Sequence, residues 1–71
     1  MTTVDARGLS CPLPLALAKR EMAKLARGER LVVLATDPEA PIDLGGWAAD
    51  EGHAYSERSC GGHVEVTLTK A

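Results

Sequence analysis

The chain has 71 residues, of which 45% are apolar and 25% are charged, and its net charge is −2. A chain this short forms one small domain, which we place at residues 1–71, and it leaves no room for the enclosed cavity of a conventional enzyme. The slightly acidic balance and the scarcity of aromatic residues argue against a nucleic-acid-binding surface. No apolar run is long enough to cross a membrane, and the N-terminus lacks the basic start and apolar core of a signal peptide. We therefore expect a cytoplasmic binding or carrier module.

The first half of the chain predicts a strand, a helix and a second strand. Residues 3–6 form a short strand candidate. A helix is predicted over residues 12–27, because a proline in the first turn and Gly28 after the last turn are typical of helix ends. Residues 30–36 are almost continuously apolar, as in a strand that is buried on both faces. The apolar positions of the helix, at helical spacing, are Leu15, Ala18, Met22 and Leu25.

The second half predicts a shorter helix and two more strands. Residues 41–51 form the helix, which Gly52 ends. Residues 53–58 form a strand, and residues 59–62 form a turn. Residues 63–70 alternate between apolar and polar side chains, which is typical of a half-buried strand. The apolar positions of the second helix are Ile42, Leu44, Trp47 and Ala48, and the inward positions of the last strand are Val64, Val66 and Leu68.

The predicted order of elements is therefore β-α-β-α-β-β. Right-handed crossovers between parallel strands would place both helices on one face of the sheet. We expect an α/β (α+β) two-layer sandwich with a mixed four-stranded sheet. The first three strands should run in the same direction, and the last strand should run back.

Cys11 lies where the first strand's exit loop meets the first helix, at the N-cap or next to it. Unpaired backbone N–H groups and the positive helix end favour anions there, so we expect the pKa of this thiol to be lowered. Pro12 and Pro14 stiffen the first turn, and Arg7 lies close enough in sequence to add positive charge. An exposed thiolate of this kind attacks sulfur electrophiles and can hold an extra sulfur as a persulfide. The alternative is a cysteine that merely packs at a helix start, and physical reasoning alone favours neither.

Residues 5–14, DARGLSCPLP, resemble the signature of the TusA (SirA-like) sulfur-carrier family. In that family an acidic residue, a Gly-Leu pair and Cys-Pro-X-Pro precede the first helix. The resemblance implies the two-layer sandwich and a persulfide on Cys11. We assign the catalytic role to Cys11, with no metal and no cofactor other than this covalent sulfur. The supporting residues are Arg7, Gly8, Pro12 and Pro14, and further similarity lies at Gly28-Glu29, Thr36-Asp37-Pro38, Asp43 and Gly52-His53.

The resemblance also implies a function. The chain would act as a persulfide sulfurtransferase of the carrier type, which accepts sulfur from a cysteine desulfurase or a rhodanese and turns over only with its partner proteins. Relatives serve tRNA thiolation, molybdenum-cofactor supply or sulfur oxidation. Leu13 stands where the tRNA-thiolation members usually have Glu, and Trp47-Ala48-Ala49 stands where some members have a second cysteine, so the pathway stays open. The alternative function is a redox-sensing or regulatory protein-interaction module.

The side of the first helix opposite its sheet-facing stripe carries a mixed apolar and basic surface. Leucines beside a reactive sulfur, continued by basic residues, suit a transient interface with an acidic protein partner. The alternative is that a flanking segment covers the leucines and the charges serve solubility. We expect a monomer that binds a sulfur donor and a sulfur acceptor but neither nucleic acid nor membrane. The predicted docking residues are Leu13, Leu17, Arg20 and Lys24.

Several other residues carry hypotheses that we rank lower. Cys60 should lie at the same sheet edge as Cys11, as a second sulfur site, a resolving thiol or, more simply, a loop cysteine. Cys60, His63 and His53 would make an incomplete zinc site, so we expect no metal there; His53 instead should pair with backbone. Asp37 and Asp43 are expected to have structural roles as turn or cap residues.

Overall fold

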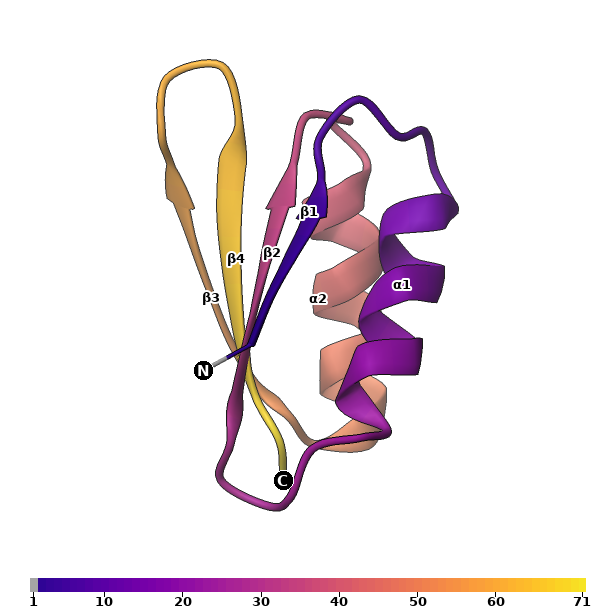
Figure 1. The fold of residues 1–71 in the computed structure, drawn as a ribbon, viewed down its shortest axis with the longest axis vertical. Coiled ribbons are helices and arrows are strands. Elements are labelled where there is room, and N and C mark those ends of the chain that lie inside the picture. The colour runs from indigo at the N-terminus through magenta and orange to yellow at the C-terminus, as the bar shows by residue number, and fades with distance from the viewer. Residues whose placement is uncertain (1) are drawn as a thin grey trace.

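The computed structural model describes residues 2–71 as a four-stranded sheet with two helices packed on one face (Figure 1). The predicted order of elements and the two-layer architecture are both confirmed. Neither helix of the described chain is long and apolar enough to cross a membrane. The elements in chain order are β1 (Thr2–Ala6), α1 (Leu13–Met22), β2 (Arg30–Ala35), α2 (Ala40–Glu51), β3 (Ala54–Ser59) and β4 (Val64–Thr69).

The topology of the sheet gathers three loops at one edge. The strand order is β1-β2-β4-β3, with β1 parallel to β2 and β4 antiparallel to both of its neighbours. Strands β1, β2 and β3 therefore run in the same direction, as predicted. The loop after β1, the loop after β2 and the β3–β4 turn consequently lie at the same end of the molecule (Figure 1).

The core fills the space between the sheet and the helices. The two central strands β2 and β4 supply most of its largest fully buried side chains, and each fully buried leucine contributes roughly 1.5–3 kcal/mol to stability. Small alanines on β1 and on both helices allow the two layers to approach closely. The buried core cluster consists of Val4, Ala6, Ala18, Met22, Leu31, Val33, Leu44, Ala48, Val66 and Leu68.

Helix α1 ends at Met22, five residues before the predicted end at residue 27. After Met22 the backbone tightens, because the Leu25 N–H donates to the carbonyl oxygen three residues back, at 3.1 Å. The Lys70 ammonium group then donates to the carbonyl oxygens of Met22 and Leu25, at 3.0 and 2.7 Å. A lysine that follows β4 thus satisfies carbonyl groups that the helix end leaves free. Leu25 still packs against the core, as predicted.

Helix α2 buries a narrower stripe than the sequence predicted. Ile42, expected at an apolar position of the helix, is 73% exposed. At about 100° per residue it lies roughly 200° around the helix from the first buried residue, so it points away from the core. Trp47 is half-buried and packs against the core as expected, with its ring edge-on to His53 at a centroid distance of 5.2 Å. The buried residues of α2 are Ala40, Leu44 and Ala48.

Candidate functional site

Cys11 is exposed in the loop that connects β1 to α1. Gly8 has a φ of +82°, which favours glycine, and turns the chain directly after β1. Its N–H donates to the Thr36 hydroxyl oxygen at 2.9 Å, and the Cys11 N–H donates to an Asp37 carboxylate oxygen at 2.7 Å. The loop after β1 is therefore fastened to the loop after β2. The N-cap of α1 is Pro12, so Cys11 lies one residue before the cap.

The thiol of Cys11 contacts helix α2 rather than its own helix. The S–H group donates to an Asp43 carboxylate oxygen at 2.7 Å. Two negative charges would repel strongly at this separation, so a proton lies between the sulfur and the carboxylate at neutral pH. Glu39 joins the group, and its carboxylate lies with the other two ligand atoms within 4.8 Å of one another. The group offers three of the four ligands that a structural zinc site uses.

The prediction of a lowered thiol pKa is wrong. The hydrogen bond to Asp43, then partial desolvation of the sulfur, and then the negative charges of Asp43, Glu39 and Asp37 raise the pKa of Cys11 to about 11. The expected effect of the α1 terminus is outweighed, because the Asp43 carboxylate accepts a hydrogen bond from the sulfur and Glu39 and Asp37 add further negative charge around it. Cys11 is consequently a protonated thiol in the unpartnered protein.

Arg7 does not supply the positive charge that was expected beside Cys11. Its guanidinium group forms a two-pronged ion pair with Asp5, with both N–O distances at 2.9 Å. This pair, together with the Arg7 backbone N–H, lowers the pKa of Asp5 to about 2. Arg7 therefore braces the turn after β1, and its supporting role is structural. Pro14 is buried, while Pro12 is exposed at the start of the helix.

Asp37 is a turn residue before α2, one of the two structural roles predicted for it, whereas Asp43 does more than expected. Asp37 accepts the backbone N–H of Glu39 at 2.9 Å and that of Cys11, and these bonds lower its pKa. Asp43 was expected to be structural, but its carboxylate touches the reactive sulfur. The sequence could have indicated this contact, because Asp43 lies in the first turn of α2. Helix α2 follows β2, the strand that pairs with β1, so its first turn lies near the loop that carries Cys11.

Cys60 lies at the same sheet edge as Cys11, as predicted, because it follows the C-terminal end of β3. Its N–H closes the β3–β4 turn by donating to the His63 carbonyl oxygen at 2.9 Å. His53 precedes β3, and a six-residue strand separates the two ends by about 20 Å. The suggested zinc ligands Cys60, His63 and His53 are therefore not brought together. His53 accepts the backbone N–H of Ala71 at 3.0 Å, as its expected pairing with backbone requires.

Three of the four predicted docking residues, which lie on α1 or directly after it, are exposed. Leu13 is 50% exposed beside the Cys11 loop. Arg20 and Lys24 are also exposed, and both bind Glu21, at 3.3 and 3.1 Å. The prediction that Leu17 belongs to the exposed surface is wrong. Leu17 is half-buried and packs against the core, because it lies only about 100° from the centre of the buried stripe. The apolar part of this surface is therefore Leu13 alone.

A family model described as the sulfurtransferase TusA matches residues 2–70 of the chain. The chain belongs to the TusA family. This TusA-family chain is 35% identical over 69 residues to the sulfur carrier protein TusA of Allochromatium vinosum, which covers 96% of this chain and 91% of that relative. A SirA-like protein from Desulfitobacterium hafniense has the same fold, with a TM-score of 0.90, 31% identity and coverage of 97% and 96% of the two chains.

Two further relatives are named as candidate sulfur carrier proteins. One, from Neisseria meningitidis serogroup A, is 42% identical over 57 residues, which is 80% of this chain and 77% of the relative. The other, YrkF of Bacillus subtilis, is 39% identical over 61 residues. That match covers 86% of this chain but 33% of YrkF, so this TusA-family chain spans a third of that relative's length. Membership of the family supports a sulfur carrier role for the chain.

Proposed function

We propose that Cys11 carries sulfur as a persulfide, taking it from a donor protein such as a cysteine desulfurase or a rhodanese and passing it to an acceptor protein. One observation carries the proposal within this family. The exposed thiol of Cys11 has a carboxylate of Asp43 at 2.7 Å that can accept its proton. A nucleophile paired with a base at hydrogen-bonding distance is the arrangement that covalent transfer needs.

In the first transfer the sulfur of Cys11 attacks the outer sulfur of the donor persulfide. The Cys11 proton moves to Asp43 as the new S–S bond forms, and the donor's S–S bond breaks. The donor leaves as a thiolate and takes up a proton. The net change converts the donor persulfide and the Cys11 thiol into the donor thiol and a Cys11 persulfide, so no oxidant or reductant is consumed.

In the second transfer an acceptor thiolate attacks the outer sulfur of the Cys11 persulfide. The sulfur of Cys11 then leaves, and a proton held at Asp43 can return to it. A leaving thiol departs more slowly when its pKa is high, so this proton return offsets the raised pKa of Cys11. The same raised pKa keeps the thiolate fraction low between transfers, which limits oxidation of the exposed sulfur.

The donor protein docks on the exposed side of α1 in this proposal. Leu13 lies two residues from Cys11, and the basic side chains of Arg20 and Lys24 continue the surface away from it. An acidic donor surface would be steered to these charges before its persulfide meets Cys11. Because Glu21 binds both basic side chains, it partly offsets their charge.

Mass spectrometry tests the proposal. The protein is incubated with a cysteine desulfurase and cysteine in the absence of reductant, and a sample without cysteine serves as the control. One added sulfur atom, located by peptide mapping on Cys11, is the expected result. An unchanged mass, or sulfur found on Cys60 instead, would contradict the proposal. Oxidation of Cys11 without sulfur addition would favour the redox-sensing alternative.

A further inference from the structure

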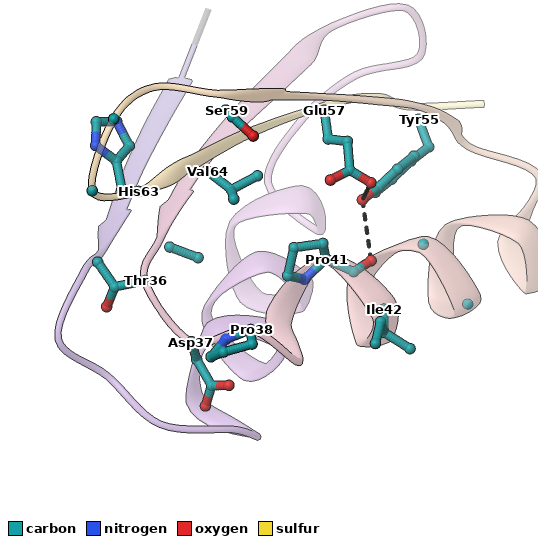
Figure 2. A pocket seen from close by; sticks show the side chains of 15 residues that line it. Thr36, Asp37, Pro38, Pro41, Ile42, Tyr55, Glu57, Ser59, His63 and Val64 are labelled. Carbon is teal, nitrogen blue, oxygen red and sulfur yellow. Dashed lines mark hydrogen bonds between the residues drawn. The ribbon is translucent and has the colours of Figure 1, made fainter.

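An open groove lies beside the Cys11 loop, between the first turns of α2 and the β3–β4 hairpin (Figure 2). Its volume is about 730 Å³, which is within the range of pockets that bind a drug-sized ligand or a few side chains. Pro41 and Ile42 line it from α2, and Tyr55 and Val64 line it from the hairpin. Asp37 closes the end nearest the Cys11 loop.

The groove exists because α2 covers only part of the edge strand β3. At one end the ring of Tyr55 packs under Gly45, where an added Cβ atom would lie 3.6 Å from it. Further along the same face of β3, Glu57 and Ser59 stay exposed, and both line the groove. The Tyr55 hydroxyl lies 3.1 Å from the Pro41 carbonyl oxygen and 3.0 Å from a Glu57 carboxylate oxygen, which places that carboxylate on the groove side (Figure 2).

The groove is acidic as well as apolar. Asp37 and Glu57 line it. Glu39 and Asp43, which are sequence neighbours of the lining residues Pro38 and Ile42, add two more carboxylates at the Cys11 thiol. None of the ion pairs among residues 2–71 involves any of these four carboxylates. No lysine or arginine lines the described groove. Within the described chain these carboxylates accept hydrogen bonds from uncharged groups only, and Ile42, at 73% exposure, adds a large apolar contact.

We propose that this groove binds an extended segment of a sulfur-exchange partner that carries a lysine or arginine among apolar residues, next to the cysteine that exchanges sulfur with Cys11. The inference rests on the proposed function and adds the chemistry of the partner. Basic side chains complement the carboxylates at both ends, and apolar side chains cover Ile42, Pro41 and Val64.

The position of the groove explains why the occupant is a protein segment that flanks a cysteine. During transfer one sulfur atom lies between the Cys11 sulfur and the partner's cysteine sulfur, and each S–S bond that it forms is about 2 Å long, so the partner's cysteine must come within about 4 Å of Cys11. Asp37 both holds the Cys11 backbone N–H and lines the groove. The chain beside the partner's cysteine therefore meets the groove within a few residues of the exchange site.

NMR tests binding without any sulfur chemistry. The unloaded protein, labelled with ¹⁵N, is titrated with acetyl-Arg-Leu-Arg-Val-Ser-Gly-amide and with a control peptide in which glutamates replace the arginines. The proposal expects saturable shifts at the amides of Gly45, Gly46 and Gly61 with the basic peptide only. Equal shifts with both peptides, shifts elsewhere, or the same shifts on simple concentration of the protein, as a second copy in the groove would give, would overturn it.

Transfer kinetics test the same groove in action. Cys11 is loaded with inorganic polysulfide, and sulfur transfer is followed by mass spectrometry to the same two peptides with cysteine in place of serine. The measured quantity is the ratio of the transfer rate to the basic peptide over the rate to the acidic peptide. At low salt this ratio should be roughly fivefold higher for the wild type than for Glu57→Gln or Ile42→Ser. Glu51→Gln, an exposed acid at the far end of α2, is the matched control and should keep the wild-type ratio.

The two experiments test the groove and the carrier function independently of each other. A wild-type ratio that survives both groove substitutions would overturn the groove and leave the carrier function standing. Failure of Cys11 to load would overturn the carrier function, and the titration of the unloaded protein would still decide whether the groove binds a basic segment.

Discussion

The two helices lie side by side on the same face of the sheet (Figure 1), yet they carry opposite charge. Helix α1 carries Lys19 and Arg20, and Lys24 follows it closely, against the single acid Glu21. Helix α2 has no basic residue at all. Its acidic residues are Asp43, Asp50 and Glu51.

Cys11 lies at the junction of these two surfaces. It precedes the first turn of α1, but its thiol is bonded to α2 through Asp43. A carrier must meet two proteins in turn, and opposite charges on the two sides of the sulfur allow each to be selected separately. We infer that an acidic partner approaches along α1 and that a basic segment approaches along the groove beside α2.

The charge contrast between the two helices bears on sulfur transfer only if Cys11, which lies between them, is the sulfur site. Cys11→Ser should abolish sulfur loading, because a serine hydroxyl does not ionise at neutral pH. Cys60→Ser should retain most of it, since the Cys60 sulfur lies in the hairpin turn, where it contacts the Arg58 carbonyl oxygen at 3.7 Å. Intact-mass measurements after incubation with a desulfurase check both variants, and similar losses from the two would refute the assignment.

The α1 side of the comparison is tested by reversing its charge. Arg20→Glu combined with Lys24→Glu should slow loading from a protein donor by about tenfold at low salt, because two exposed attractions become repulsions. The effect should shrink in 1 M salt, where the Debye length is about 3 Å. Loading by inorganic polysulfide needs no docking and serves as the control. An unchanged rate with the protein donor at low salt would show that this surface is not the interface.

The α2 side predicts a smaller effect, on stability at high pH. An unfolded cysteine has a pKa near 8.5, whereas the pKa of Cys11 in the folded protein is about 11. A raised folded pKa gives a contribution that is complete below the unfolded value and is lost as the pH rises through the folded value. Urea unfolding of the wild type should therefore lose more stability between about pH 8.5 and pH 11 than that of Cys11→Ser. Parallel pH profiles would contradict the Asp43 bond.

Much of the fold could be predicted because local signals agree with the final packing. The proline at the start of α1, Gly52 at the left-handed C-cap of α2 and the alternation in β4 each mark an element that the structure confirms. The errors concern contacts between elements. At the end of α1, Lys70, which is distant in sequence, binds the Met22 carbonyl oxygen and that of Leu25 in the following turn. The exposure of Ile42 depends on how α2 is rotated against the sheet.

At the site, too, features set by local sequence signals could be predicted, and features set by contacts between elements could not. The placement of Cys11 at a loop before a helix follows from sequence, because turn and helix signals are local. Its pKa does not, because the deciding carboxylate of Asp43 is 32 residues away and reaches the sulfur only when α2 packs beside α1. The usual rule for a thiol at a helix N-terminus considers one helix, whereas here the neighbouring helix determines the charge at the sulfur.

Direct titration of the Cys11 thiol is the most decisive measurement. Cys60→Ser provides a protein with one cysteine, whose Cβ chemical shift is followed by NMR as a function of pH, alone and combined with Asp43→Asn. We predict a pKa of about 11 with Asp43 present and a clearly lower value with asparagine, because the substitution removes the charged acceptor of the S–H bond. A thiol that titrates at or below the ordinary cysteine value with Asp43 in place would contradict the account.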